Sequence, residues 1–350
     1  MKEDEHMLNR YDRQERVTVI GHDGQRRINA ATILIVGVGA LGSYAAEQLV
    51  RAGVGHLILV DPDTVSLTNL QRQALFTEAD VRDQALKVDA AKNHLQAINH
   101  HVEITAYPAA LDGDLLQTLT FDLVLDCLDN YGTRILINRA ALVERFDYIF
   151  ASCAGTFGTV MPIRAWQHAC LNCVYHNLEA LQQTDCDLLG VNTALVPIIA
   201  GLQVSLALHY LVAPTSVDFE QLTTIDNWQL SQQTFHVRKN HNCPTCQRTD
   251  WDLTTAPITN PVQVLCGTAT YQARFTQKPN LAAITDCLLD RQFSIKSYAS
   301  FISFKWEDRP ISIFKNGKVM LYNIPDLDAA TATFNRLQLY LKSVLEVPIK

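Results

Sequence analysis

The sequence predicts an α/β fold: a doubly wound, mainly parallel sheet with an antiparallel extension, followed by a small C-terminal α+β domain. Three observations support this fold class. Unbroken apolar runs such as residues 32–36 alternate with segments of helical period, as in parallel sheets that are buried on both faces. Two later runs, residues 222–225 and 234–238, have the pattern of an antiparallel hairpin. From Thr249 the composition shifts towards Thr, Pro and Asn, as in a linker.

The first elements form one strand–helix–strand unit. Residues 8–31 are expected to be a polar helical arm, and the apolar run 32–36 is a strand closed by Gly37. Residues 42–52 have helical period and end at a glycine, and residues 56–60 are a second buried strand. Such a unit is typical of Rossmann-like nucleotide-binding folds.

The same rhythm continues to the hairpin. Helices are expected at residues 87–98, 132–145 and 197–211, and strands at 103–106, 121–125 and 148–152. In the tail, helices are expected at 281–290 and 328–345, and strands at 300–306, 311–314 and 319–322. Asn316-Gly317 is a favourable hairpin turn between two of those strands. We therefore divide the chain into residues 1–248 and 249–350.

Composition excludes several classes of protein. A formal charge of −7 argues against a nucleic-acid partner, and the charged N-terminus lacks the apolar run of a signal peptide. The apolar stretch 190–214 contains Asn192, Gln203, Ser205 and His209, which favours a buried helix with Pro197 in its first turn over a membrane span. Nine cysteines without an export signal indicate a reducing compartment, so we expect a cytoplasmic location and no membrane partner.

A glycine-rich turn stands where the first strand passes into a helix. Gly37, Gly39 and Gly42 allow a phosphate to approach the backbone, and the helix N-terminus supplies free N–H groups. Asp61 follows the next strand, where a carboxylate can hold ribose hydroxyls. The pattern fits NAD, FAD or ATP.

Cations and a further carboxylate favour ATP. Cleavage between the α and β phosphates requires positive charge, which Arg72 and Lys87 could supply, although either residue alone is more often solvated. Asp129 follows a later parallel strand and could bind Mg²⁺, or it could cap the next helix.

Two CxxC pairs suit a structural zinc site. Cys170 and Cys173 precede Cys243 and Cys246 by about seventy residues, so the pairs must meet through the fold. A redox pair or two unrelated pairs are the alternatives. Cys186 lies in a polar segment between two aspartates and has no assigned role. The remaining cysteines are expected in the core, namely Cys127, Cys153, Cys266 and Cys287.

The order and spacing of these motifs resemble the MoeB/ThiF/HesA family, the bacterial relatives of ubiquitin-activating enzymes. The resemblance covers residues 8–247. It rests on Arg10-Tyr-Asp-Arg-Gln, the glycine turn, residues 61–73, residues 126–130 and both CxxC pairs.

The resemblance implies a homodimer with one ATP site in each subunit. The residues matching that site are Gly37, Gly39, Gly42, Asp61, Asn69, Arg72, Lys87 and Asp129. In the family pattern Asp61 holds the ribose and Asp129 binds Mg²⁺. Asn69, Arg72 and Lys87 bind the phosphates. Arg13 matches an arginine that reaches into the partner's active site, and the CxxC cysteines match a structural Zn²⁺ site.

The implied substrate is a small β-grasp sulfur-carrier protein that ends in Gly-Gly, similar to MoaD or ThiS. Its C-terminal carboxylate, with a pKa of about 3.5, is ionised at neutral pH and needs no general base. Attack on the α-phosphate releases pyrophosphate and gives an acyl-AMP, which a persulfide sulfur donor then converts to a thiocarboxylate. The residues do not separate molybdopterin from thiamine biosynthesis, and we favour molybdopterin slightly.

The sequence departs from the family in several places. Ala40 stands where many relatives have glycine, and the approach to Lys87 is one residue longer. The tail has no Cys-centred loop of the rhodanese type, and we expect it to support carrier docking or dimerisation. Two other functions are weighed against this one: an NAD-dependent oxidoreductase with structural zinc, and a scaffold that binds a β-grasp protein without activating it.

Overall fold

The computed structural model describes residues 10–176, 178, 190–253, 262–265, 270–275, 279–298, 301–315 and 317–345. The chain forms two compact units, Met1–Pro257 and Ile258–Lys350. This boundary lies later than the predicted one, which follows residue 248. Each unit has its own sheet, and no hydrophobic cluster of the described residues is shared between the units.

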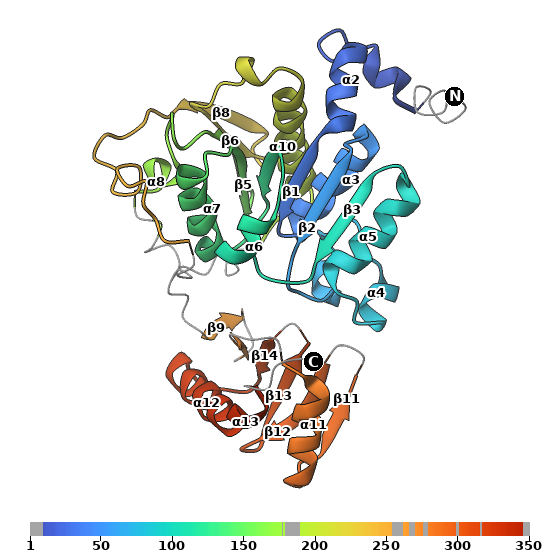
Figure 1. Cartoon of the computed structure of the whole chain (residues 1–350), viewed down its shortest axis with the longest axis vertical. Helices are drawn as coiled ribbons and strands as arrows, with labels where there is room; N and C mark the ends of the chain where they lie inside the picture. The colour runs from blue at the N-terminus through green and yellow to red at the C-terminus, as the bar shows by residue number, and fades with distance from the viewer. Residues whose placement is uncertain are drawn as a thin grey trace. The chain divides into compact units, whose positions relative to one another are not determined.

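The first unit is built on an eight-stranded sheet (Figure 1). In their order across the sheet, the strands are β3 (Glu103–Tyr107), β2 (His56–Val60), β1 (Thr32–Val36), β4 (Leu123–Asp126), β5 (Tyr148–Ala154), β6 (Phe157–Ile163), β7 (Gln221–Asp226) and β8 (Ser231–His236). The first five strands are parallel, and β6 to β8 extend the sheet in antiparallel fashion. The predicted fold class is therefore confirmed.

Helices cover both faces of this sheet. They are α2 (Gly21–Ala30), α3 (Ala40–Ala52), α4 (Glu78–Arg82), α5 (Lys87–Ile98), α6 (Gly113–Thr118), α7 (Tyr131–Val143), α8 (Leu171–Val174) and α10 (Leu195–Val212), with 3₁₀ turns η1 (Leu67–Asn69) and η3 (Pro214–Ser216). One core lies between the sheet and α3, α5 and α10, and the other lies between the sheet and α6, α7 and α8.

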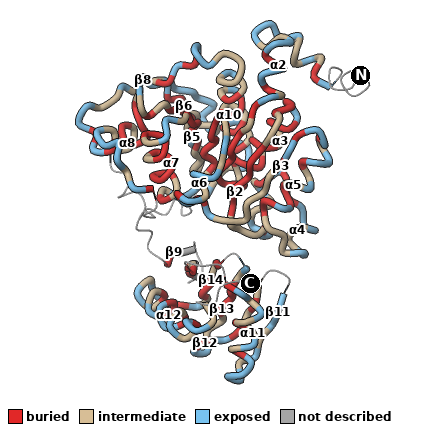
Figure 2. The backbone as a smooth tube through the Cα atoms, viewed as in Figure 1, coloured by how far each residue is buried: buried red, intermediate tan, exposed pale blue. Residues whose placement is uncertain are grey.

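Strand β1 shows why the sheet is buried on both faces. Ile33 and Ile35 contribute to the α3 side, whereas Leu34 and Val36 contribute to the α7 side. Since successive side chains of a strand point to opposite faces, a strand between two helical layers must be apolar throughout. Figure 2 shows the central strands as the most continuously buried part of the first unit.

Helix α10 is long and apolar enough to cross a membrane by length and composition alone. In the fold it packs against α3, β5 and β6, and Leu195, Ile199 and Val204 belong to the core. A buried helix was expected here, and Pro197 does lie in its first turn. Packing in the core therefore accounts for the apolar composition of α10.

In its described residues, the second unit contains a six-stranded antiparallel sheet and three helices. The strands run in the order β11 (Ile295–Ser297), β12 (Phe301–Trp306), β13 (Arg309–Phe314), β14 (Lys318–Leu321), β10 (Thr270–Arg274) and β9 (Val262–Leu265). The helices are α11 (Leu281–Asp290), α12 (Leu327–Tyr340) and α13 (Lys342–Leu345). Both longer helices pack on the same face of the sheet, because Ile284 and Phe334 share a core with Ile311 and Leu321.

Candidate functional site

The glycine turn between β1 and α3 is shaped by close backbone approaches. Gly37 has φ +89°, and a Cβ atom there would lie 2.8 Å from the carbonyl oxygen of Cys127. A Cβ atom on Gly42 would overlap the carbonyl oxygen of Gly37. At Gly39 a Cβ atom would make only an ordinary contact, 3.6 Å from Nε2 of Gln73, so the backbone there is less crowded. Ala40 has no positive φ, and the alanine is tolerated.

The N-terminus of α3 suits an anion. The helix begins after Gly39 without a side-chain cap, and its first turn contains no acidic residue. The first N–H groups of a helix have no intrahelical partner, and the helix dipole places partial positive charge there. The glycine turn and this helix end therefore fit the phosphate groups of a nucleotide.

Asp61 lies beside this turn. Its carboxylate accepts hydrogen bonds from the backbone N–H groups of Val38 and Asp63, each at 2.8 Å. Burial raises the pKa of Asp61, and Lys87 opposes that rise. The carboxylate thus joins the glycine turn to the segment that follows β2.

Lys87 brings the predicted acidic residues together. Its Nζ is 3.3 Å from Oδ2 of Asp63 and 3.8 Å from Oδ2 of Asp61. Burial alone would lower the pKa of Lys87, but the carboxylates of Asp61, Asp63 and Asp129 raise it above its ordinary value. Lys87, Asp61 and Asp63 therefore form one charged cluster, and the charge of Asp129 also acts on Lys87. The sequence analysis missed Asp63, although it lies only two residues after Asp61.

Asn69 and Arg72 lie in the loop after β2. The side chain of Asn69 accepts a hydrogen bond from the N–H of Ser66, and Arg72 donates to the carbonyl of Thr68 at 2.9 Å. In the part of the chain that the structure describes, neither side chain contacts Lys87 or Asp129. The end of the loop is nevertheless fixed to α3, because the N–H of Ala74 donates to the hydroxyl of Ser43.

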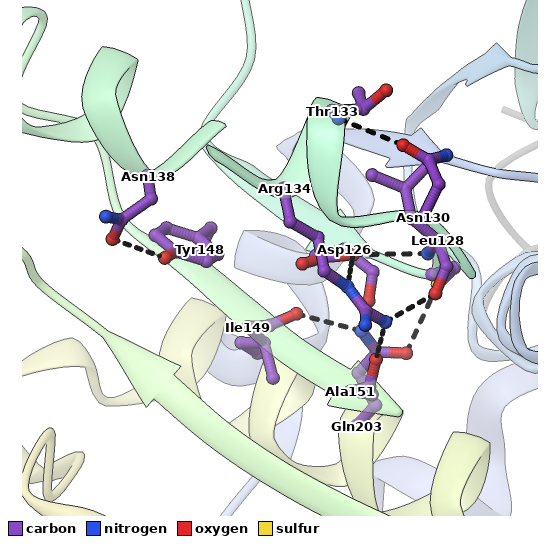
Figure 3. Close-up of polar contacts among 11 residues, drawn as sticks. Asp126, Leu128, Asn130, Thr133, Arg134, Asn138, Tyr148, Ile149, Ala151 and Gln203 are labelled. Carbon is purple, nitrogen blue, oxygen red and sulfur yellow. Dashed lines mark hydrogen bonds and ion pairs between the residues drawn. The ribbon is translucent and has the colours of Figure 1, made fainter. Parts of the chain in front are cut away.

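Asp129 follows β4 and is exposed. It does not cap α7, because the N-cap is Asn130, whose side chain accepts a hydrogen bond from Thr133 (Figure 3). The carboxylate of Asp129 is therefore left available to a ligand. Arg134, on the first turns of α7, is buried beneath this segment. The sequence analysis did not single out Arg134, because a lone arginine in a helix usually faces solvent.

Arg13 is exposed on the N-terminal helix, residues 10–15. The neighbouring Tyr11 is buried, accepts a hydrogen bond from Asn99 and fills the space over Gly53. These contacts fix the arm on the first unit. Arg13 itself contacts neither Lys87 nor Asp129 among the described residues of this single chain.

The four cysteines of the CxxC pairs meet in space, as predicted. Sγ of Cys170 is 3.9 Å from that of Cys173 and 3.8 Å from that of Cys243, and Cys173 is 3.4 Å from Cys246. All four sulfur atoms lie within 4.8 Å of one another. A tetrahedral ion with metal–sulfur bonds of about 2.3 Å would separate its ligands by about 3.8 Å. The cluster therefore fits a metal ion.

The other cysteines lie in several environments. Cys127 is buried, as expected, and donates to the side-chain oxygen of Gln203, while Cys153 and Cys287 are half-buried. Cys186 and Cys266 lie outside the described residues, as does Asn316 of the expected turn.

Comparison with known proteins gives consistent matches for the first unit. A sequence model described as the ThiF family matches residues 11–245. The sulfur carrier protein ThiS adenylyltransferase of Bacillus subtilis is 31% identical over 337 residues, which cover 94% of this chain and 99% of that protein. The molybdopterin-synthase adenylyltransferase of Escherichia coli is 33% identical over 247 residues, covering 69% of this chain and 97% of that protein.

Solved structures support the fold. The crystal structure of E. coli MccB with ATP has a TM-score of 0.59 and 19% identity, and the match covers 68% of this chain and 74% of that chain. At this identity the match establishes a shared architecture for the first unit.

Proposed function

The chain belongs to the ThiF family, and on that premise we propose that it is an adenylyltransferase that uses ATP to activate the C-terminal carboxylate of a small sulfur-carrier protein. The relatives with 31–33% identity include proteins named as adenylyltransferases of ThiS and of molybdopterin synthase. The single observation that carries the proposal is the contact of Lys87 with Asp61 and Asp63 beside the glycine turn.

The proposed ATP site uses the residues around that turn. Gly37, Gly39 and Gly42 give the phosphates access to the backbone, and Asp61 holds the ribose. Asn69, Arg72 and Lys87 bind the phosphates, and Asp129 binds Mg²⁺, which neutralises phosphate charge when it is present. The less crowded backbone at Gly39 and the exposed carboxylate of Asp129 fit this ligand.

The protein's contribution to the reaction is positioning and charge stabilisation. The carrier carboxylate is the nucleophile, and it is already ionised at neutral pH. Negative charge grows on the departing pyrophosphate, and the ammonium of Lys87 and the guanidinium of Arg72 are the cations that oppose it. Lys87 keeps its proton in this role, because its neighbouring carboxylates raise its pKa.

Zn²⁺ is the metal we propose for the four-cysteine cluster, since four thiolates in a closed tetrahedral arrangement are typical of structural zinc. The cluster links the start of α8 to the segment after β8, and a bound metal would hold these two parts of the first unit together.

We favour a ThiS-like carrier, and therefore thiamine biosynthesis, over a MoaD-like one. The Bacillus subtilis relative named for ThiS matches across nearly its whole length, the second unit included, whereas the molybdopterin-synthase relative covers 69% of this chain. The slight preference for molybdopterin in the sequence analysis is replaced on this ground. A homodimer in which Arg13 enters the partner's site, a persulfide sulfur donor and a cytoplasmic location complete the proposal.

The test is pyrophosphate exchange into ATP against a panel of purified Gly-Gly carriers. Exchange that depends on one carrier, and that is lost when its last glycine is removed, is the expected result. Binding of NAD without exchange for any carrier would instead favour an oxidoreductase with structural zinc. Carrier binding without exchange would favour a scaffold.

A further inference from the structure

A buried ion pair lies beneath the segment that carries Asp129 (Figure 3). Nε of Arg134 donates to Oδ1 of Asp126 at 3.3 Å, and both side chains are almost wholly removed from solvent. The other carboxylate oxygen of Asp126 has no hydrogen-bond partner among the described residues. Arg134 therefore provides most of the compensation for this buried charge.

Arg134 also bridges two neighbouring strands of the sheet. Its Nη2 donates to the carbonyl of Leu128, after β4, and to the carbonyl of Ala151 in β5 at 2.9 Å. The guanidinium lies over the ring of Phe150, 4.9 Å from its centroid. Such a fixed fork of donors can hold three oxygen atoms at once, which an ammonium on a flexible stem does less well.

These contacts fix the backbone on both sides of Asp129. Leu128 is held by its carbonyl, through Arg134, and by its N–H, which donates to Oδ1 of Asp126 at 3.1 Å. Asn130 is held as the cap of α7 by its contact with Thr133. Asp129 is the one residue between these two fixed points.

We propose that Arg134 is a positioning residue that sets the place of the Asp129 carboxylate for a divalent cation. This inference rests on the proposed function, in which Asp129 binds Mg²⁺. Asp126 and Asp129 then have separate roles. The charge of Asp126 is neutralised inside the fold by Arg134, whereas the carboxylate of Asp129 faces the ligand.

The chemistry of the pair supports a role beyond stability. Apolar side chains of similar volume often replace a buried ion pair without loss of stability, so such a pair is weak evidence for a purely stabilising function. Residues that hold a metal ligand in place typically change metal affinity or activity by about 10- to 100-fold when they are replaced.

The test is the binding of Mn²⁺, followed by electron paramagnetic resonance, to the full chain with a non-hydrolysable ATP analogue. The decisive variant is the double substitution Asp126→Asn with Arg134→Met. It leaves the local net charge unchanged, keeps an acceptor for the N–H of Leu128 and removes the contacts with both carbonyls. Asn138→Ala is the matched control, because Asn138 lies one turn further along α7 and bonds instead to Tyr148 and Leu171.

We expect the double variant and Asp129→Asn each to weaken Mn²⁺ binding about 10- to 100-fold, and Asn138→Ala to bind Mn²⁺ like the wild type. Wild-type affinity in the double variant, with binding lost in Asp129→Asn, would overturn the role of Arg134 and leave the proposed function intact. Wild-type affinity in Asp129→Asn would overturn the inference together with the proposed metal ligand. Failure of the proposed function shows separately, as absence of carrier-dependent exchange in the wild type.

Discussion

Two buried carboxylates lie on opposite sides of β1, and each is paired with a cation in a different way. Asp61 follows β2 and is 3.8 Å from Lys87, while Asp126 ends β4 and is 3.3 Å from Arg134. The side chain of Lys87 is 9% exposed, and it also faces Asp63, which is 33% exposed. Arg134 and Asp126 are 2% and 0% exposed.

The difference separates a binding pair from a positioning pair. Lys87 is drawn to several carboxylates in a region that reaches the surface, so an incoming phosphate can compete for its ammonium. The guanidinium of Arg134 is already bonded to a carboxylate and two carbonyls, and it is closed to ligands. A carboxylate paired with a cation at the end of a strand can thus serve two purposes, and the exposure of the pair decides which.

Loss of Lys87, the cation of the more exposed pair, should have the largest effect on catalysis. We expect Lys87→Met to lower kcat for pyrophosphate exchange by roughly 10²- to 10³-fold, the usual cost of removing one group that stabilises charge in the transition state. Exchange is measured at saturating Mg²⁺, where Arg134→Met should lose less. Equal losses in the two variants would erase the distinction between the pairs.

For the free energy of unfolding we expect the opposite order, with Arg134→Met more destabilising than Lys87→Met. Arg134→Met leaves the buried Asp126 uncompensated and should cost about 3–5 kcal/mol of unfolding free energy. Lys87→Met should cost about 1–3 kcal/mol, because Asp61 keeps the N–H donors of Val38 and Asp63. Urea unfolding measures both values. The comparison fails if Lys87→Met proves the more destabilising.

Removal of the metal proposed for the four-cysteine cluster should affect neither the Lys87–Asp61 pair nor the Arg134–Asp126 pair. We expect Cys246→Ala to lose bound zinc, measured by elemental analysis, and to unfold more readily, because the segment after β8 loses its link to α8. Mn²⁺ affinity should stay at the wild-type value. Cys287→Ala, which alters a half-buried cysteine of the second unit, is the control and should retain zinc. Weaker Mn²⁺ binding in Cys246→Ala would show that the cluster supports the Asp129 segment as well.

The smallest effect is expected from alkaline pH. The pKa of Lys87 is raised above its ordinary 10.5, so its charge stabilises the fold fully below that value and is lost only as the pH rises through the higher, folded-state pKa. Exchange should therefore show no decline attributable to Lys87 up to roughly pH 10. A pH–rate profile measures this. A decline below that pH that is absent in Lys87→Arg would contradict the assignment.

Several elements could be predicted from the sequence because one local feature determines each. The apolar runs of β1 and β2 gave the bounds that the structure shows, and α5 and α11 were also predicted with their observed bounds. Strand β6 was missed, because Gly158 and Pro162 interrupt its pattern. Pro162 is tolerated since it lies beyond the part of β6 that pairs with β7, which ends at Val160.

The sequence by itself determined the family, the glycine turn and the residues proposed to bind phosphate and metal, because these depend on short motifs at fixed spacing. Only the tertiary structure decided which charged side chains meet. Cys170 and Cys243 are 73 residues apart in the chain and become neighbours only when β8 joins the sheet. Arg134 likewise differs from a solvated arginine only because α7 packs against β4 and β5, where water can no longer compensate its charge.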